Sequence, residues 1–366
     1  MNEETLYTIA VTLLPNVGAI NGKRLISHCG CAKDVFKEKK NSLLKIQGIS
    51  NGIIDGMNNK EIFFRAEREM RFMEKNSVRA ISYFDSNYPV RLKRCIDSPV
   101  ILYVRGNILP EKERMLTVVG TRNASDYGNR ICEKIIFEIS DYDIGIISGL
   151  AYGIDTEAHR NSLKYGLDTF AVLGHGLQTV YPAKNLNLAR NIESYGSLIS
   201  EFISETKPDR ENFPQRNRII AGLCDAVLII EAAEKGGALI TVEIAGSYNK
   251  DVFAVPGRVN DKYSTGCNKL IKNQQACMIL SGSDIIENMN WDNKISKRVI
   301  QQNLFYELNE IQNEIVEFMR NNSSGCDIDN ISDKLNIPIG RLSCELLDLE
   351  LKGVLHCLPG KVYKMM

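Results

Sequence analysis

Three short loops in the chain have residue types that suit anion binding. They are Gly120-Thr121-Arg122 with Ser125 and Gly128, Ser148-Gly149 with Gly153 and Asp155, and Glu231 with Gly236-Gly237. Each loop follows a short apolar run and precedes a helical pattern. Glycines let backbone N–H groups approach a ligand closely, and a helix N-terminus favours negative charge. Three such loops on one sheet edge predict a ligand with several phosphates.

A cationic segment, Phe213-Pro-Gln-Arg216-Asn217-Arg218, adds side chains that bind phosphate oxygens. Its arginines and asparagine are hydrogen-bond donors, and its phenylalanine can stack on an unpaired base. The alternative is a helix start whose arginines pair with carboxylates. Asp155 and His159 lie four residues apart on one predicted helix face. A helix cap and an internally bonded histidine explain that pair at least as well as catalysis does.

Other chemistries match the sequence poorly. No Ser/His/Asp or Cys/His set has the context of a nucleophile, so no catalytic residue is predicted. The first strand is not followed by the glycine pattern of a dinucleotide site, and Gly174-His175-Gly176 has only two of its three glycines. His28-Cys29-Gly30-Cys31 offers three metal ligands, but no second pair follows at zinc-finger spacing. We therefore predict neither a cofactor nor a metal.

Seven short β-rich apolar runs position these loops, and their starts recur every 25 to 29 residues. The runs are Leu116–Val119, Ile144–Ile147, Thr169–Leu173, Ser197–Ile199, Ala226–Ile230, Val252–Val255 and Cys277–Leu280. Helical patterns such as Arg130–Ile139, Thr156–Tyr165 and Leu239–Tyr248 lie between them. This alternation predicts an α/β fold, an extended Rossmann-like core with a mostly parallel sheet, over residues 76–290. Open sheets of this kind bind ligands at the carboxyl ends of their strands.

Two smaller domains flank the predicted core. Within residues 1–75, Leu13–Ile26 and Leu43–Ile54 share an apolar–Gly–apolar–x–x–Gly spacing, which predicts a helical domain of helix-hairpin-helix or SAM-like type. Such hairpins can present backbone amides to DNA phosphates, but a purely structural helical cap is the favoured interpretation.

Residues 291–303 are polar and are predicted to be a linker, and residues 304–366 have the pattern of a winged-helix domain. Its predicted elements are the helices Leu304–Arg320, Ile328–Leu335 and Ile339–Leu351 and the hairpin Val354–Met365. The helix that would enter a DNA groove, Ile339–Leu351, carries Arg341 against Glu345, Asp348 and Glu350. Repulsion between these acids and phosphates weighs against groove binding.

Composition narrows the function classes. Basic and acidic residues are equal at 45 each, so a polyanion site must be built by placement of charges and not by their excess. No apolar run approaches the ~20 residues of a membrane span, and the N-terminus lacks a signal-peptide pattern. Ten cysteines are scattered with no Cys-x-x-Cys, which fits reduced thiols. We expect a cytoplasmic protein without a membrane partner.

Several motifs together resemble the DNA-processing protein A family (DprA, also called Smf). They cover roughly residues 83–280, in the family's order and spacing. The motifs are Val119–Arg122 with Ser125 and Gly128, Ser148–Asp155 with Ala158–Arg160, Gly174–Leu177 with Tyr181-Pro182 and Asn185, Phe213–Leu223, Gly236–Thr241, and Asp251–Arg258 with Ser264, Gly266 and Asn268.

The resemblance implies a non-catalytic mediator that binds incoming single-stranded DNA, protects it and loads the RecA recombinase in natural transformation. It also implies a homodimer formed through the Rossmann-like domain. Arg122 is implied as a principal phosphate contact. The full set of expected DNA-binding residues is Gly120, Thr121, Arg122, Ser125, Ser148, Gly149, Lys184, Phe213, Arg216, Asn217, Arg218, Gly236 and Gly237. The chain departs from the family at Ala183, where a basic residue often follows Tyr-Pro, and at His175, where many relatives have Cys or Thr.

Two alternatives from other classes stay open at this point. Gly236-Gly237 with Thr241 and Glu243 distantly resembles the site of nucleoside-monophosphate phosphoribohydrolases, although Lys235 replaces its proline and the third glycine is missing. The other alternative is a winged-helix regulator with a sensor core, which the acidic helix Ile339–Leu351 disfavours.

Overall fold

The structure is a computed structural model that describes residues 3–292, 309–320, 326–351, 354–358 and 362–365. The chain divides into two compact units, Met1–Arg298 and Val299–Met366. Within the described residues, no helix combines the length and the apolar character that crossing a membrane requires.

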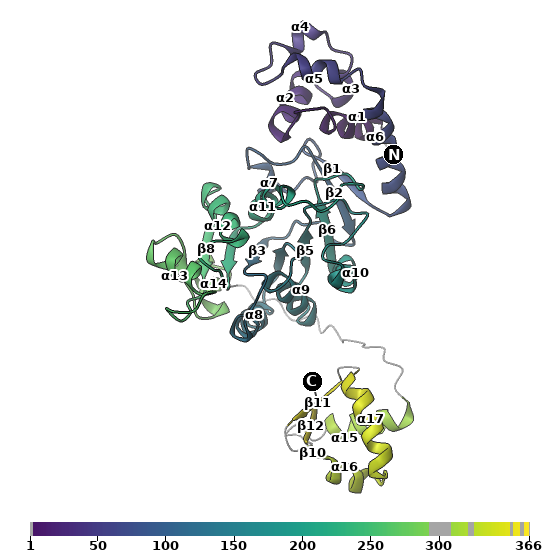
Figure 1. Ribbon diagram of the computed structural model, residues 1–366, viewed down its shortest axis with the longest axis vertical. Coiled ribbons are helices and arrows are strands. Elements are labelled where there is room, and N and C mark those ends of the chain that lie inside the picture. The colour runs from purple at the N-terminus through teal and green to yellow at the C-terminus, as the bar shows by residue number, and fades with distance from the viewer. Residues whose placement is uncertain (1–2, 293–308, 321–325, 352–353, 359–361, 366) are drawn as a thin grey trace. The chain divides into compact units, whose positions relative to one another are not determined.

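The described part of the first unit contains a nine-stranded sheet (Figure 1). Its strands are β1 (Arg79–Ser82), β2 (Ile101–Gly106), β3 (Arg114–Val119), β4 (Ile144–Ser148), β5 (Thr169–Val172), β6 (Gly196–Ser200), β7 (Ala226–Ile229), β8 (Asp251–Ala254) and β9 (Cys277–Met278). The seven strands from β3 to β9 pair with one another in parallel and match the seven predicted runs. The predicted α/β class with a mostly parallel sheet is thus confirmed.

Strands β1 and β2 were not among the predicted elements. Strand β2 pairs antiparallel with β6, with Tyr103 opposite Ser200, and β1 pairs antiparallel with β2, with Ile81 opposite Leu102. They precede the regular strand–helix alternation, so the pattern that identifies the other strands does not extend to them.

The order of the strands creates a switch point at β3. The order is β1-β2-β6-β5-β4-β3-β7-β8-β9, so the chain builds from β3 in one direction through β6 and then returns to the other side of β3 with β7. Val119 at the end of β3 is paired with Ile229 at the end of β7. A crevice outside the carboxyl ends of the strands is expected at such a point, and it is where open α/β sheets bind their ligands.

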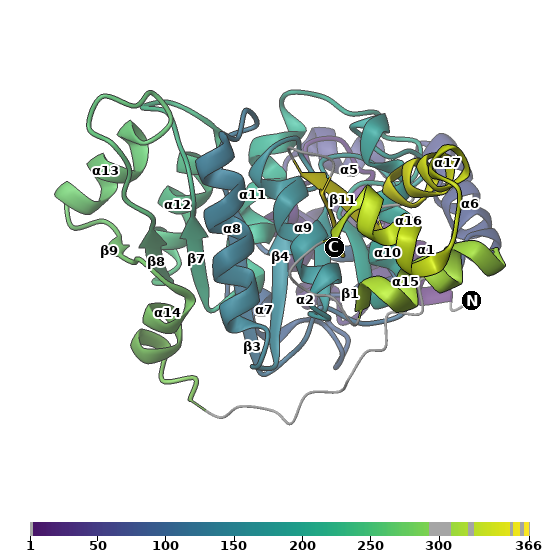
Figure 2. The same cartoon turned by 90° about the horizontal axis from the view of Figure 1, so that it is seen from below.

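Helices cover both faces of the sheet. One face packs against α8 (Asp126–Ile139), α9 (Ile154–Lys164) and α14 (Gly282–Met289), and α8 and α9 lie side by side (Figure 2). The other face packs against α7 (Val90–Lys93), α11 (Asn212–Leu223), α12 (Gly237–Ser247) and α13 (Thr265–Lys272). Alternate residues of β3 serve the two cores, Leu116 and Val118 facing α8 and Met115 and Val119 facing α11. The 3-10 turn η1 (Ala183–Asn185) and α10 (Leu186–Tyr195) follow β5.

The N-terminal helices belong to the same unit as the sheet. They are α1 (Glu3–Thr12), α2 (Ala19–Cys29), α3 (Ala32–Val35), α4 (Lys40–Leu43), α5 (Asn51–Gly56) and α6 (Lys60–Lys75). The two predicted hairpins fall at the turns between α1 and α2 and between α4 and α5. Gly48 in the second turn has a φ of +90°, a conformation that favours glycine. The apolar side chains of these helices share a core with Val100, Tyr103 and Ala171. DNA contact by these hairpins stays a prediction.

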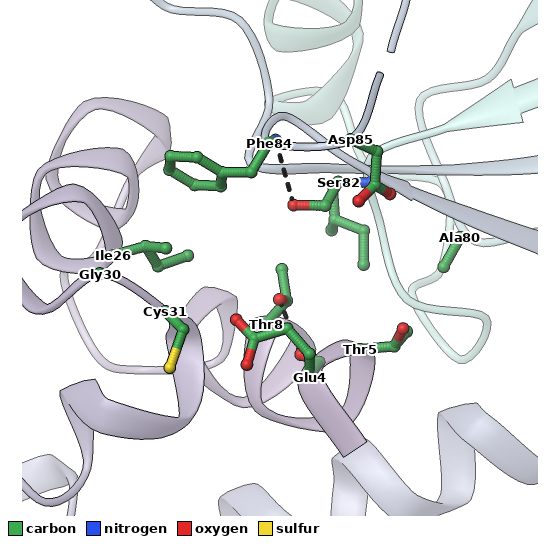
Figure 3. A pocket seen from close by; sticks show the side chains of 11 residues that line it. Glu4, Thr5, Thr8, Ile26, Gly30, Cys31, Ala80, Ser82, Phe84 and Asp85 are labelled. Carbon is green, nitrogen blue, oxygen red and sulfur yellow. Dashed lines mark hydrogen bonds between the residues drawn. The ribbon is translucent and has the colours of Figure 1, made fainter. Parts of the chain in front are cut away.

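A small cavity of about 120 Å³ lies between the N-terminal helices and the turn after β1 (Figure 3). The carboxylate of Glu4 borders it and accepts the backbone N–H groups of Ala32 and Lys33 at the start of α3. On the opposite wall, Phe84 N donates to Ser82 Oγ at 3.4 Å. The acidic group in this cavity therefore joins α1 to α3, which is a structural task.

The second unit has the predicted winged-helix elements. They are α15 (Glu310–Arg320), β10 (Cys326–Asp327), α16 (Ile328–Leu335), α17 (Ile339–Leu351), β11 (Leu355–Leu358) and β12 (Val362–Met365), with strand order β10-β12-β11. Their core includes Ile315, Ile331 and Leu342. Residues 293–308, which include most of the predicted linker and the first residues of the predicted helix Leu304–Arg320, lie outside the described residues.

Candidate nucleic-acid interface

A cation and two aromatic rings meet near the switch point of the sheet. Arg122 follows β3 and is exposed, and its guanidinium carbon lies 5.4 Å from the centre of the Phe213 ring. Phe213 comes from the first turn of α11 and is half-buried. The ring of Tyr181, itself exposed, lies 6.1 Å from that of Phe213. This cluster presents positive charge beside aromatic faces, a combination that suits phosphate and unstacked bases.

The Phe213 ring has a fixed support. A Cβ atom at position 174 would lie only 2.9 Å from Phe213 Cδ1, so glycine at this position allows the ring to pack on the backbone after β5. The guanidinium carbon of Arg216, one turn further along α11, is 6.0 Å from the same ring centre. The glycines of the Gly174-His175-Gly176 turn thus serve packing here.

Arg216 is buried, in contrast to Arg122. It is 4% exposed, and its Nη1 donates to the carbonyl of Val172 at 2.7 Å. A Cβ at position 149 would lie 1.8 Å from the same nitrogen, so Gly149 is what lets the guanidinium fit against this loop. Burial lowers the pKa of Arg216 to about 10, opposed by nearby Asp155, so the group stays charged at neutral pH. Arg216 supports the loops of the site from below.

Two of the three predicted phosphate loops are filled by the protein's own carboxylates. The buried Glu231 carboxylate accepts Ser125 N at 2.9 Å and Ser125 Oγ at 2.5 Å, beside the N-terminus of α8. In the second loop Asp155 accepts Ala151 N at 3.4 Å, and Ser148 Oγ donates to Val118 O at 2.7 Å. Burial raises the pKa of Asp155, and the charge of Arg216 opposes that shift. Internal anions thus satisfy donors that the sequence assigned to a ligand.

The third loop is open. Gly236 and Gly237 are exposed, no atom lies within 4 Å of where a Cβ would be at either residue, and no side chain caps the N-terminus of α12. Asn217 Nδ2 donates to Gly237 O at 3.3 Å and so ties this loop to α11. Phe213 and Asn217 are four residues apart on α11, and side chains at that spacing share a helix face. One face of α11 therefore joins the Arg122 cluster to the open loop.

Arg218 is engaged by protein partners. Its guanidinium forms an ion pair with Glu201 and donates to the carbonyl of Asp97, and each side chain of the pair is 14% exposed. Burial raises the pKa of Glu201, and Arg218 opposes this shift. Helix α11 begins at Asn212, so Arg218 lies in its second turn and not at its start. These contacts favour the ion-pair alternative over a phosphate contact.

Lys184 is exposed on η1, beside residues that anchor this segment to the second loop. The next residue, Asn185, donates to Leu150 O at 3.0 Å and to Thr156 Oγ1 at 2.8 Å. Lys184, one place after the position where the family often has a basic residue, is therefore exposed near the second loop.

Sequence reasoning did not select Tyr181 as a site residue. Its backbone N–H donates to Nε2 of buried His175 at 3.3 Å, and the other ring nitrogen of His175 lies 2.9 Å from Gly176 O. Burial lowers the pKa of His175, so its ring is neutral and Nε2 can accept. The sequence signal that could have identified Tyr181 is an aromatic residue three positions before Lys184, which was itself selected.

The cysteine-rich segment at the end of α2 lies apart from this site. His28 Nε2 is 3.3 Å from Ser42 Oγ, and burial raises the pKa of Cys29 to about 11. Among the residues that the structure describes, no three His, Cys, Asp or Glu side chains gather as metal ligands would. Glu243, of the phosphoribohydrolase alternative, is exposed on α12.

Fold and site together define a class: a Rossmann-like protein that presents an arginine–aromatic cluster and an open glycine loop at the switch point of its sheet. Residues 79–290 match the family described as DNA recombination-mediator protein A, and residues 306–361 match the DprA winged helix domain. The chain belongs to this DprA/Smf family.

Individual relatives agree with this assignment. The chain is 34% identical to protein Smf of Synechocystis over 79% of its own length and 73% of the relative's. It is 38% identical to DNA processing protein DprA of Streptococcus pneumoniae over 64% and 83% of the two lengths. The X-ray structure of the Streptococcus pneumoniae protein matches with a TM-score of 0.67 at 33% identity, covering 78% of this chain and 98% of that one.

A Helicobacter pylori DprA structure, described as showing a unique single-stranded DNA binding mode, matches with a TM-score of 0.53. It is 27% identical and covers 58% of this chain and 95% of its own.

Proposed function

We propose that this protein binds single-stranded DNA at the carboxyl edge of its sheet and acts as a recombination mediator. The observation that carries the proposal is the exposed Arg122 guanidinium 5.4 Å from the Phe213 ring. In this arrangement Arg122 holds a phosphate, Phe213 and Tyr181 stack bases, and the amides of Gly236-Gly237 hold a second phosphate. Gly120, Thr121 and Gly149 shape the loops that position these groups.

The buried members of the predicted set have positioning roles in this proposal. Arg216 supports the loop at Gly149, Asn217 ties α11 to Gly237, and Ser125 and Ser148 hold the loops through Glu231 and Val118. Lys184 is proposed as a further phosphate contact because it is exposed near the second loop. The single strand is preferred over duplex because stacking on Phe213 needs an unpaired base face.

The test compares Arg122→Ala with Arg218→Ala by oligothymidine titration at several salt concentrations and by thermal melting. Arg122→Ala should cost on the order of 1–3 kcal/mol of binding and lower the salt slope by roughly 0.7, because one phosphate contact is lost. Arg218→Ala should lower the melting temperature, because it leaves Glu201 buried without its cation, and keep the wild-type slope.

A blunt duplex of equal length is the control ligand, and wild-type protein should bind it more weakly than the single strand. An unchanged slope in Arg122→Ala, or equal affinity for duplex, would place the DNA elsewhere.

The finer role that we propose is protection of incoming DNA and loading of RecA in natural transformation, by a cytoplasmic homodimer formed through the Rossmann-like domain. Its support is the family membership given above. RecA-driven strand exchange on DNA coated with a single-strand-binding protein should accelerate when this protein is added. Sedimentation of the wild-type chain should give twice the monomer mass. No acceleration would confine the function to DNA binding.

A further inference from the structure

A second basic surface lies beside the proposed site, and its charged lining residues are outside the family motifs. Two adjoining cavities of about 430 and 380 Å³ share Arg105 and Gln178 in their walls. Together they form a groove bounded by the end of α6, strand β2, the segment before η1 and helix α10. We call it the α6–α10 groove. Helix α10 packs on β6 and β2 at this side of the sheet (Figure 1).

The groove is cationic. Its charged lining residues are Arg71 and Lys75 of α6, Arg105 of β2, and Arg190 and Glu193 of α10. The only acid among them, Glu193, already pairs with Arg105 at 2.8 Å. Within the described part of the chain neither Lys75 nor Arg190 pairs with a carboxylate, and both are exposed. Arg71 pairs with Glu67 of α6 at 3.8 Å, so Lys75 and Arg190 are the two lining cations left without a carboxylate partner among the described residues.

The groove is continuous with the Arg122 cluster through one short segment. Thr179, Val180 and Ala183 line the groove, whereas Tyr181 in the same segment contacts Phe213. Lys184 follows directly and is exposed. A strand that leaves the stack on Phe213 and Tyr181 can thus pass Lys184 and enter the groove without crossing an acidic surface among these residues.

We propose that the α6–α10 groove is a second single-stranded DNA subsite, in which Lys75 and Arg190 bind the phosphates of a strand that continues from the Arg122 cluster. The inference rests on the proposed function and extends it to a longer footprint. Apolar lining residues such as Val180 and Leu186 offer surfaces for bases between the phosphate contacts. In this proposal the N-terminal helical region contributes to DNA binding through the end of α6.

The experiment uses the full chain and two oligothymidines, one of about six nucleotides, which one single-strand site can hold, and one of about 25. Lys75→Ala with Arg190→Ala should leave affinity for the short strand unchanged. Affinity for the long strand should fall about tenfold, at three- to fivefold for each exposed charge contact. The salt slope for the long strand should fall by about 1.4, at roughly 0.7 per phosphate.

Lys60→Ala is the matched control, since Lys60 is an exposed lysine at the other end of α6, about 22 Å away at 1.5 Å per residue. It should bind both strands as the wild type does, and Arg190→Lys should recover affinity because it restores the charge. Unchanged long-strand affinity in the double variant, or equal losses for both strands, would overturn the inference.

Arg122→Ala separates this failure from failure of the proposed function. If the double variant binds as the wild type does while Arg122→Ala lowers the affinity for both strands, only the proposal for the α6–α10 groove is wrong. If Arg122→Ala binds as the wild type does while the double variant loses affinity for the long strand, the groove binds DNA and the primary site lies elsewhere.

Discussion

Arg122 and Arg218 are residues of the same type, but their neighbours in the fold suit them to different roles. Arg122 follows the Gly120-Thr121 turn and Arg218 follows the Phe213 segment, and both motifs suit phosphate binding. Arg122 is exposed over an aromatic ring, whereas Arg218 is held by the Glu201 carboxylate and the Asp97 carbonyl. Releasing Arg218 to DNA would leave Glu201 buried and unpaired, which costs several kcal/mol. We therefore propose the phosphate contact at Arg122, the arginine without a carboxylate partner among the described residues.

Phe213 tests the stacking component of the site by itself. Phe213→Ala should weaken oligothymidine binding by roughly 1–3 kcal/mol, the range for removal of one base–aromatic stack. Phe213→Tyr keeps the ring and should bind as the wild type does. Titration should be repeated with a strand of equal phosphate number that lacks bases.

Wild-type protein should bind the abasic strand more weakly, and Phe213→Ala should no longer distinguish the two strands. Continued discrimination by Phe213→Ala would show that another ring carries the stacking.

At the scale of elements, buried polar groups link the helices to the sheet. His159 of α9 is fully buried, with Nδ1 at 2.7 Å from Thr169 Oγ1 of β5 and Nε2 without a hydrogen-bond partner among the described residues. Burial, with a smaller contribution from the charge of Arg216, lowers the pKa of His159 to about 3. These contacts of Asp155 and His159 favour the interpretation as a cap and an internally bonded histidine over a catalytic pair.

His159 should make stability depend on pH between about 6.5 and 3. In this window the unfolded histidine binds a proton that the native one does not, so stability falls as pH falls, by up to about 1.4 kcal/mol per pH unit. His159→Gln cannot titrate and should lose less stability between pH 6.5 and 4.5 in urea unfolding. The same substitution at exposed His28 is the control and should change the slope less. Equal slopes for His159→Gln and wild type would contradict a neutral buried imidazole.

At the scale of the whole molecule, we propose that DNA binds to the first unit. Residues 292–366 carry 9 basic and 11 acidic side chains. On α17, Glu345 and Asp348 accept hydrogen bonds from Gln312 Nε2 at 2.8 and 2.7 Å. Carboxylates along the helix that would enter a DNA groove repel phosphates. We therefore expect a protein partner for this unit, and not DNA.

Deleting residues 293–366 should therefore change single-strand affinity by less than about threefold, because all the proposed phosphate contacts lie in the first unit. Circular dichroism and thermal melting would establish that the shortened chain is folded before titration. A loss of tenfold or more in a folded truncation would assign DNA contacts to the second unit.

The strands β3 to β9 and the winged-helix elements could be predicted from the sequence because their signals are local. Apolar runs repeat at a regular interval, and helical spacing identifies α16 and α17. The glycine loops and the Phe213–Arg218 segment were likewise found from residue types. Strands β1 and β2 were missed because they lie before that repeat, and the pairing of β2 with β6 joins residues about 100 positions apart.

The amino-acid sequence is sufficient to predict the class of fold, the sheet edge at which the site is proposed and the residue types gathered there. Which of those residues are free to bind a ligand depends on the contacts that form when the chain folds. Glu231 fills one predicted phosphate loop, Asp155 fills another, and Glu201 holds Arg218. These partners lie between 4 and about 106 residues away along the chain. A charged side chain is free to bind a ligand only when folding places no opposite charge within hydrogen-bond distance of it. Residue type alone does not predict that distance.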